Sequence, residues 1–302
     1  MGGGKTVRFE YCEALGVGYE RGITRRDPSC VICVDGLFHV WYTKTPHGPS
    51  GYDATVWHAT SEDGIGWEEI GEALPRGGAG EWDEQSVFTP NILAADGGYF
   101  LFYTSVEKPY SEEALTAIGV AFADSPNGPW NKFEGSPVLR TGPDSSWDSH
   151  RVDDACLVVR DGLYWLYYKG RQMGLSPRET RMGLAVAEQP MGPYRKVPEN
   201  PLIEGGHEVC VWRQGEGVAA LVQPNGPEGG TLQYSRDGIH FRTFAEARPP
   251  QAPGPYRADR FENGQGCAGI EWGLHINLRS SPLPFLERFT CEGLAEDWHL
   301  SG

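Results

Sequence analysis

Short apolar runs that end in Asp-Gly recur along the chain, and a second run rich in aromatic residues follows each of them. Three copies are clear, and they begin at Asp27, Phe88 and Asp153: DPSCVICVDGLFHVWYTKT, FTPNILAADGGYFLFYTSV and DDACLVVRDGLYWLYYKGR. Asp-Gly between two strand-like runs is a strong signal for a tight hairpin. The pattern therefore predicts two antiparallel strands in each copy.

Two weaker copies follow the three clear ones. They are HEVCVWRQGEGVAALVQP, where Gln214-Gly215 replaces Asp-Gly, and CAGIEWGLHINL. The first four copies continue into a third strand-like run, a Gly-containing turn that ends in an aromatic residue, and a more polar fourth run. Four strands repeated five times with a period of about 60 residues predict an all-β fold, a five-bladed β-propeller with four-stranded antiparallel blades.

The repeats also predict the domain organisation. A single blade cannot bury its own faces, so the ring has to close as one unit, and we expect residues 1–302 to form one propeller domain. The N-terminal segment of about 20 residues, up to Ile23, is expected to supply the outer strand of the last blade. The 41 glycines, 23 prolines and 12% aromatic residues agree with many short strands joined by tight turns.

Cysteine usage and the N-terminus bear on the compartment. The chain has seven cysteines, an odd number, which favours reduced thiols in a cytoplasmic protein. The first residues lack the apolar core of a signal peptide, and no run approaches the ~20 apolar residues of a membrane helix. We therefore expect a cytoplasmic protein without a membrane partner.

The charge narrows the choice of partner. The net charge is −15, and lysine and arginine are dispersed along the chain. Binding to a phosphate backbone needs a basic face, so no nucleic-acid partner is expected. Sugars and metabolites remain open as ligands.

The predicted fold brings distant residues together. In a propeller the first strand of each blade lines the central channel, so the residues at its start surround the channel mouth. With the Asp-Gly turns in register, Asp153 lies opposite Asp27, and both are predicted to lie at the mouth. His207 and Glu208 begin the equivalent run of the fourth copy. Asp154 is expected to point away, because neighbouring residues of a strand face opposite sides.

Acids that converge on one cleft beside a proton donor suit the hydrolysis of a glycosidic bond. One carboxylate activates water, and a donor on the other side of the sugar protonates the leaving oxygen. Asp27, Asp153, His207 and Glu208 are the catalytic candidates. Either His207 or Glu208 is the donor, and Glu208 is expected to raise the pKa of His207 and so populate its acid form.

These segments resemble glycoside hydrolase family 117, the neoagarobiose-hydrolase-like α-1,3-3,6-anhydro-L-galactosidases, among the five-bladed glycosidases related to families 43 and 32. The resemblance rests on TRRDPSCVICVDGLFHVWYT, WDEQSVFTPNIL, SHRVDDACLVVRDGLYWLYYKG and GGHEVCVW, and covers roughly residues 20–222. It implies an inverting exo-hydrolase that removes a terminal 3,6-anhydro-L-galactose from agar oligosaccharides.

The resemblance also implies roles for the candidate residues. Asp27 resembles the general base, and Asp153 resembles the acid that fixes the substrate and modulates a pKa. His207 resembles the histidine general acid of family 117. In families 43 and 32 the donor is a glutamate, which would be Glu208 here.

Further candidates lie close to the predicted mouth. Gln85, Trp147, His150 and Arg151 are expected to contact the sugar. No metal ligands are predicted and no cofactor is required, although the channel could hold a divalent cation or a water cluster. The expected partner is an oligosaccharide substrate, and the sequence leaves the oligomeric state open.

Two other functions remain open at this point. A family 43-like arabinofuranosidase or xylosidase would use Glu208 as its acid. A non-catalytic sugar-binding propeller would keep its ligand affinity when Asp27 is replaced by asparagine.

Overall fold

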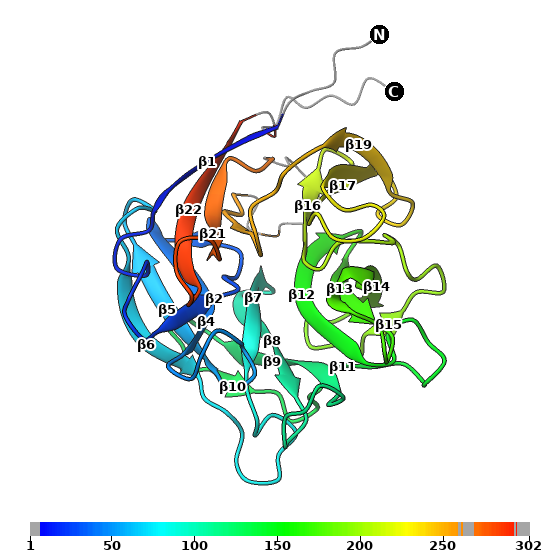
Figure 1. Ribbon diagram of the computed structural model, residues 1–302, viewed down its shortest axis with the longest axis horizontal. Helices are drawn as coiled ribbons and strands as arrows, with labels where there is room; N and C mark the ends of the chain where they lie inside the picture. Colours follow the sequence, from blue (N-terminus) through cyan, green and yellow to red (C-terminus); the bar gives the residue numbers. More distant parts are fainter. Residues whose placement is uncertain (1–6, 259–260, 262–268, 293, 295–302) are drawn as a thin grey trace.

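Five antiparallel sheets surround a central axis in the computed structural model, which describes residues 7–258, 261, 269–292 and 294 (Figure 1). The five-bladed β-propeller with four-stranded blades that the repeats predicted is thereby confirmed. Within the described residues, no helix is long and apolar enough to cross a membrane.

Each of the first four blades is built from consecutive strands, and the first of them is the innermost. Blade 1 consists of β2 (Thr24–Arg26), β3 (Ile32–Val34), β4 (Leu37–Thr45), β5 (Thr55–Ser61) and β6 (Glu68–Leu74). Blade 2 consists of β7 (Phe88–Ala95), β8 (Gly98–Val106), β9 (Thr116–Ala123), β10 (Asn131–Lys132) and β11 (Leu139–Arg140). Blade 3 consists of β12 (Arg151–Arg160), β13 (Leu163–Arg171), β14 (Arg181–Ala187) and β15 (Arg195–Lys196). Blade 4 consists of β16 (Val209–Gln214), β17 (Gly217–Val222), β18 (Thr231–Ser235) and β19 (Arg242–Glu246).

Blade 5 joins the two ends of the chain. It consists of β20 (Gly254–Pro255), β21 (Trp272–Asn277), β22 (Phe285–Glu292) and, at its outer edge, β1 (Arg8–Glu13). β1 pairs antiparallel with β22 over its whole length, so the N-terminal segment is the outer strand of this blade. The short 3₁₀ helix η1 (Pro177–Glu179) lies between β13 and β14.

The Asp-Gly turns explain why the hairpins form where the sequence predicted them. Asp35, Asp96 and Asp161 have φ angles of 50°, 51° and 53°, and the glycine after each of them also has a positive φ. A two-residue hairpin turn of this type needs a left-handed backbone at both positions, which aspartate tolerates and glycine favours.

In several blades, an aromatic residue at the end of the turn after the third strand packs against the preceding blade. Trp130 of blade 2 packs edge-on against Trp41 of blade 1, with ring centroids 5.6 Å apart. The same contact recurs between later blades in the pairs Tyr194–Phe102 and Phe241–Tyr167. Trp67 of blade 1 is buried in one cluster with Trp272 of blade 5, which closes the ring.

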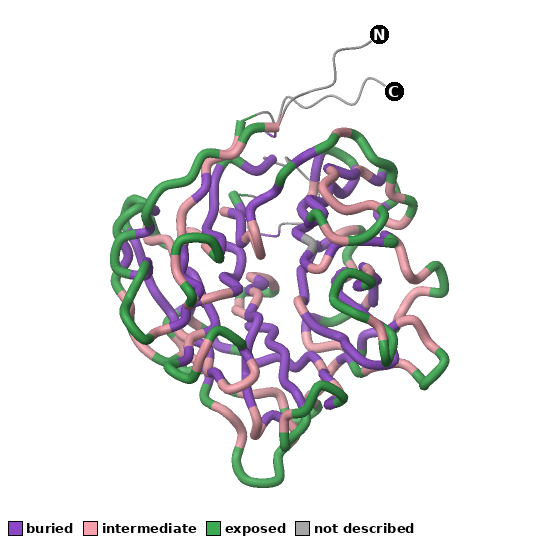
Figure 2. Tube along the Cα trace, viewed as in Figure 1, coloured by how far each residue is buried: buried purple, intermediate pink, exposed green. Residues whose placement is uncertain are grey.

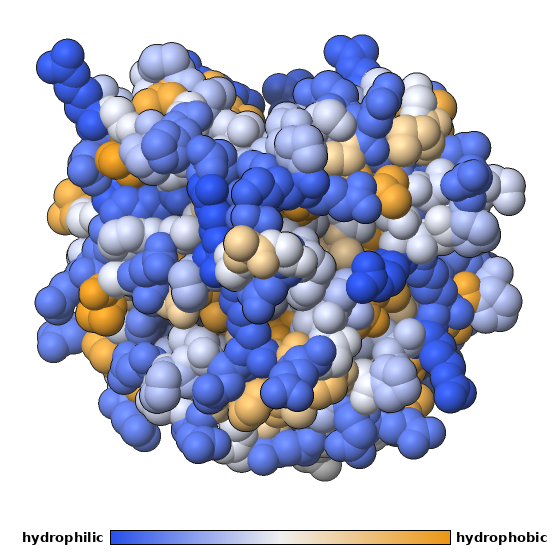
Figure 3. Space-filling view, turned by 90° about the horizontal axis from the view of Figure 1, so that it is seen from below, coloured by the Kyte–Doolittle hydropathy of each residue, from blue (hydrophilic) through white to orange (hydrophobic). Residues whose placement is uncertain are grey.

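The apolar residues are concentrated on the inner strands and between the blades. The inner strands are mostly buried, whereas the outer strands and loops are largely exposed (Figure 2). The side of the molecule in Figure 3 is mostly hydrophilic, with scattered apolar residues. This distribution fits blade-to-blade packing as the main source of stability.

A buried histidine pair in blade 1 predicts acid sensitivity of the fold. His39 Nδ1 lies 3.0 Å from His58 Nε2, and both rings stack with Trp41. Burial lowers the pKa of His39 to about 4 and that of His58 to about 3, so both are neutral in the folded state at pH 7.

We expect the free energy of unfolding to fall as the pH drops below about 6.5. The two histidines are protonated there in the unfolded chain, whereas in the folded state they remain neutral. Each histidine should contribute up to about 1.4 kcal/mol per pH unit down to its folded pKa. Urea unfolding between about pH 7 and about pH 5 measures this slope. His58→Phe should reduce it, whereas replacement of the exposed His47 by glutamine should leave it unchanged. An equal slope in the wild type and His58→Phe would contradict this assignment.

Candidate active site

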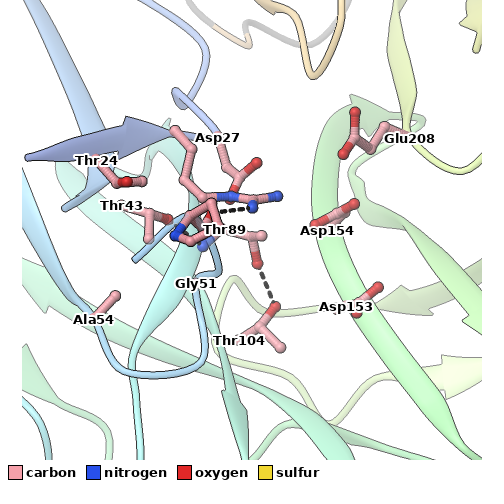
Figure 4. A network of polar contacts seen from close by, with 12 residues as sticks. Thr24, Asp27, Thr43, Gly51, Ala54, Thr89, Thr104, Asp153, Asp154 and Glu208 are labelled. Atoms are coloured by element: carbon pink, nitrogen blue, oxygen red, sulfur yellow. Dashed lines mark hydrogen bonds and ion pairs between the residues drawn. The ribbon is translucent and has the colours of Figure 1, made fainter. Parts of the chain in front are cut away.

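A pocket opens where the inner strands of blades 1 to 4 begin. It encloses about 440 Å³ of empty space that includes open solvent, within the usual size of a ligand site. Figure 4 shows Asp27 on one side, facing Asp154 and Glu208 on the other. The polar residues of its lining are Asp27, Thr89, Asn91, Asp154, Cys156 and Glu208.

Asp27 is positioned by the arginine that precedes it. It follows β2 directly, is 7% exposed, and has a left-handed backbone with a φ of 49°. Arg26 Nε donates a hydrogen bond of 2.7 Å to Asp27 Oδ2, and Arg26 Nη1 donates to the carbonyl of Pro49. Burial alone would lower the pKa of Arg26, but Asp27 and Glu208 raise it, so the guanidinium stays charged.

The structure corrects the predicted partner of Asp27 in blade 3. Arg26 pairs with Thr43 and Asp153 pairs with Lys169, so Asp153 corresponds to Arg26 and the next residue, Asp154, corresponds to Asp27. Asp154 shares the left-handed backbone, with a φ of 53°, and lines the pocket. The register of β12 against β13 shifts between Asp153 and Cys156, which marks a β-bulge at Asp154. The expectation that Asp154 points away from the channel is therefore wrong, because a bulge breaks the alternation of side chains.

Asp153 lies next to the pocket and does not line it. It is 4% exposed, and Lys169 Nζ lies 3.3 Å from its Oδ1. The same ammonium group lies 2.5 Å from Asp154 Oδ2. Burial would lower the pKa of Lys169, but Asp153, Asp154 and Glu208 raise it. A charged lysine therefore holds the two neighbouring aspartates.

Blade 2 carries hydroxyl groups where blade 3 carries charges. Thr89 occupies the position of Asp27 and Asp154, with a φ of 44°. Its Oγ1 donates to Thr104 Oγ1 over 2.6 Å, and its backbone N–H donates to Thr43 Oγ1 (Figure 4). Lys169 stands where the first two blades have threonine, so the ionic cluster is specific to blade 3 among these blades.

Glu208 immediately precedes β16 and is 6% exposed. Gln251, which lies before blade 5, donates a hydrogen bond to Glu208 Oε2. Burial raises the pKa of Glu208, and the negative charge of Asp27 raises it further, although Lys169, Arg26 and Gln251 act in the opposite direction. Glu208 is thus a carboxyl group biased toward its protonated form.

His207 differs from its prediction. Its Nδ1 lies 3.4 Å from Thr180 Oγ1, and the residue does not line the pocket. The positive charge of Lys169 lowers its pKa, and burial and the charges of Arg171 and Arg26 lower it further. The expectation that the pKa of His207 is raised is therefore wrong, because three cations and burial act to lower it.

Asp154 and Glu208 both have raised pKa values in this cluster. Burial raises the pKa of Asp154, and the negative charges of Asp153, Glu208 and Asp27 add to this effect against Lys169. Four carboxyl groups thus share two cations, Arg26 and Lys169. Like charges in a buried site cannot all ionise, so the cluster retains a proton.

The pH dependence of stability tests this charge crowding. A folded-state pKa above that of the unfolded chain means that the folded protein is destabilised as the pH rises past about 4. Asp154→Asn should therefore reduce the loss of unfolding free energy between about pH 5 and about pH 8, measured by chemical denaturation. Asp161→Asn, at an exposed left-handed position of the same blade, is the matched control and should behave as the wild type. A steeper loss in Asp154→Asn would show that its pairing with Lys169 dominates instead.

Two of the predicted sugar contacts hold the loops of the mouth. Gln85 Nε2 donates to the carbonyl of Tyr52, and Gln85 Oε1 accepts from the backbone N–H of Tyr110. Arg151 donates to the carbonyl groups of Ala114 and Glu112. Their polar groups shape the mouth, and neither residue lines the pocket itself.

The other two predicted contacts differ from each other. Trp147 stacks near Tyr168 and covers Gly183, where an added Cβ would lie 2.6 Å from its ring, so it packs on the face of blade 3. His150 is 4% exposed, and neither ring nitrogen has a hydrogen-bond partner among the residues that the structure describes.

The sequence predicted reduced thiols and no metal ligands. The six cysteines that the structure describes are free, and Cys267 lies outside the described residues. In the described part of the chain, no three His, Cys, Asp or Glu side chains are grouped as a metal site.

Comparison with known proteins connects this geometry to glycosidases. The model of the glycosyl hydrolases family 32 N-terminal domain matches residues 24–180. The structure of Zg3597, a family 117 glycoside hydrolase from Zobellia galactanivorans, superposes with a TM-score of 0.88 and 33% identity, covering 97% of this chain and 92% of that one.

The chain belongs to glycoside hydrolase family 117. This family 117 protein also has more distant relatives. A β-fructofuranosidase of rice (Oryza sativa, insoluble isoenzyme 7) is 27% identical over 150 residues, which cover 46% of this chain and 24% of the rice protein. Xylosidase/arabinosidase 43A of Humicola insolens is 28% identical over 89 residues, covering 30% of this chain and 23% of that protein. The matched part thus spans about a quarter of each of these two relatives.

Proposed function

We propose that this family 117 protein is an inverting, exo-acting glycoside hydrolase that removes a terminal sugar or anhydrosugar from an oligosaccharide. The observation that supports it is the set of carboxyl groups from blades 1, 3 and 4 around one pocket: Asp27 and Glu208, which are buried, and Asp154, which is partly buried. In this proposal Asp27 is the general base and Glu208 the general acid.

The proposed reaction is a single displacement. Asp27 accepts a proton from a water molecule, whose oxygen attacks the anomeric carbon from one face of the sugar. Glu208 donates its proton to the leaving glycosidic oxygen on the other face. The anomeric carbon–oxygen bond breaks as the new one forms, so the configuration inverts. A donor and an acceptor on opposite sides of the pocket suit these two proton transfers (Figure 4).

Asp154 and Asp153 act with Lys169 in this proposal. Asp154 lines the pocket and is held by Lys169, which suits hydrogen bonding to sugar hydroxyl groups. The negative charge that raises the pKa of Glu208 is that of Asp27, across the pocket. Asp153 then has a positioning role through Lys169, in place of the direct contact predicted from the sequence.

We assign the acid role to Glu208 because it lines the pocket and its pKa is raised. His207 is neutral at pH 7 by the same electrostatics and suits hydrogen bonding to the substrate instead. The reaction needs carboxyl groups and water, and we propose that it proceeds without a cofactor, in the cytoplasm.

A screen of oligosaccharides tests the proposal. We expect release of a single terminal unit from at least one member of a panel of agar, galactan, arabinan, xylan and fructan oligosaccharides. Asp27→Asn, purified in parallel, should release none, which excludes a contaminating glycosidase. Binding to a panel member without hydrolysis by the wild type would support the non-catalytic sugar-binding propeller instead.

A further inference from the structure

Arg171 is a buried cation that its surroundings leave unpaired. It is the last residue of β13 and only 8% exposed. Its guanidinium forms no ion pair or hydrogen bond with any residue that the structure describes, and its Nε is buried without a partner. A buried charge is costly unless it is paired, so an unpaired guanidinium points to a missing anion.

The other cations near the mouth are already occupied. Arg26 pairs with Asp27, and Lys169 lies between Asp153 and Asp154. The guanidinium of Arg151 donates to two backbone carbonyl groups. Unlike these three residues, Arg171 is thus a buried cation of the mouth whose guanidinium is available to a ligand.

The groups that face Arg171 come from several blades. Asp153, Arg151, Tyr52 and Glu112 are close enough to act on its charge, and burial together with Arg151 lowers its pKa. Arg171 also acts on the exposed carboxylate of Glu179 in η1. No described carboxylate lies within ion-pair distance of it. Tyr52 lies in the loop between β4 and β5 of blade 1 and stacks on Tyr110 with centroids 4.5 Å apart, which places an aromatic pair beside the charge.

Two histidines near Arg171 add neutral hydrogen-bonding groups. Both ring nitrogens of His150 are buried without a described partner, and Arg171 lowers the pKa of His150 after burial and Arg151. Arg171 also acts on His207 from blade 3. A neutral imidazole offers one donor and one acceptor, which suits the hydroxyl groups around an anionic substituent.

The position of Arg171 places this subsite outward from the catalytic carboxyl groups. Arg171 pairs with Arg151 at the start of β12, and Asp154 lies three residues further along that strand. Three strand residues span about 10 Å of backbone, which is enough to separate Arg171 from the position of Asp154 by the width of one sugar. The sugar on the leaving side of the bond would lie there.

We propose that Arg171, with His150 beside it, forms an anion-binding subsite, and that the sugar on the leaving side of the cleaved bond carries a carboxylate or sulfate group. A planar guanidinium can bind either oxyanion through two parallel hydrogen bonds. The inference rests on the proposed function for the direction of the substrate, and its test uses binding alone.

The experiment compares matched pairs of oligosaccharides by isothermal titration calorimetry. One arm pairs oligogalacturonides with their methyl esters, and the other pairs sulfated with desulfated galactan oligosaccharides. In one arm at least, the wild type should bind the anionic member about tenfold or more tightly than its neutral partner, and added salt should reduce this preference. The arm that shows the preference identifies the oxyanion.

Variants separate the subsite from the general charge of the mouth. Arg171→Gln should abolish the preference, and Arg171→Lys should keep only part of it. Arg178→Gln removes an exposed charge from the neighbouring η1 segment and should keep the full preference. Melting curves check that each variant folds.

Two results would overturn the inference: a wild type without preference in both arms, or an Arg171→Gln variant that melts normally and retains the preference. A preference without hydrolysis of any panel member would overturn the proposed hydrolase activity and leave the subsite standing. Hydrolysis of a panel member, without any preference for the anionic oligosaccharides, would overturn the subsite and leave the proposed hydrolase activity standing.

Discussion

Asp27→Asn is expected to lower kcat by about 10³-fold while KM changes little, because the variant cannot accept a proton from the attacking water. Asparagine keeps the size of the side chain and tolerates the left-handed backbone at this position. Arg26 loses its charged partner, so the measurement should include a melting curve. Steady-state kinetics on the best substrate of the panel gives the two parameters.

The matched control for this prediction lies in the same blade. Asp35 also has a left-handed backbone and is exposed in its hairpin turn, far along the strand from the pocket. Asp35→Asn should therefore leave kcat unchanged. If Asp27→Asn retained more than about a tenth of the wild-type kcat, Asp27 would not be the base.

Glu208→Gln is expected to lower kcat by about 10²- to 10³-fold on a natural oligosaccharide, and by much less on an aryl glycoside whose leaving group needs no proton. The reason is that glutamine cannot protonate the leaving oxygen. The raised pKa of Glu208 also predicts the pH profile: activity of the wild type should fall as the pH rises through that pKa, since the acid form is lost. This high-pH fall should be absent from the variant.

His207→Gln distinguishes the two candidate donors. The pKa of His207 is lowered, so at neutral pH the histidine is not in the imidazolium form that a general acid needs. We expect this variant to retain the high-pH fall and to change KM more than kcat. If the high-pH fall disappeared in His207→Gln and persisted in Glu208→Gln, the histidine would be the acid.

The architecture could be predicted from the sequence because its causes are local. Asp35-Gly36, Asp96-Gly97 and Asp161-Gly162 specify hairpins through their own backbone preferences, with no help from distant residues. The aromatic residue after each third strand marks a blade contact in the same local way, as Trp130 on Trp41 shows.

The register at the mouth could not be predicted because it depends on bulges. In blade 1 the chain advances six residues from Arg26 to Ile32 while its partner strand advances four, from Thr43 to His39. In blade 3 the chain advances three residues from Asp153 to Cys156, while its partner strand advances two, from Lys169 to Tyr167. Alignment on the Asp-Gly turns therefore placed the site of blade 3 one residue early.

A weaker signal in the sequence does give the correct register. Asp27, Thr89 and Ala252 each precede a proline and each have a left-handed backbone in the structure. Asp154 precedes Ala155 at the equivalent place. Thr89 lies seven residues before Asp96, and Asp154 lies seven residues before Asp161, so alignment of blade 3 on Thr89-Pro90 of blade 2 would have selected Asp154.

The charges around His207 could not be predicted from its neighbours in sequence. Glu208 is adjacent along the chain, but Lys169, which acts most strongly on His207, comes from another blade. Lys169 stands at a position where the first two blades have threonine, and only the folded ring shows that its ammonium reaches the cluster.

The central claim is that Asp27 and Glu208 act from opposite sides of one sugar in a single displacement. Time-resolved proton NMR of the first product released from the best oligosaccharide, before mutarotation, tests it most directly. We predict that the new reducing end has the anomeric configuration opposite to that of the cleaved bond. Release of the sugar with its configuration retained would contradict the account, because it requires a covalent intermediate that these roles do not provide.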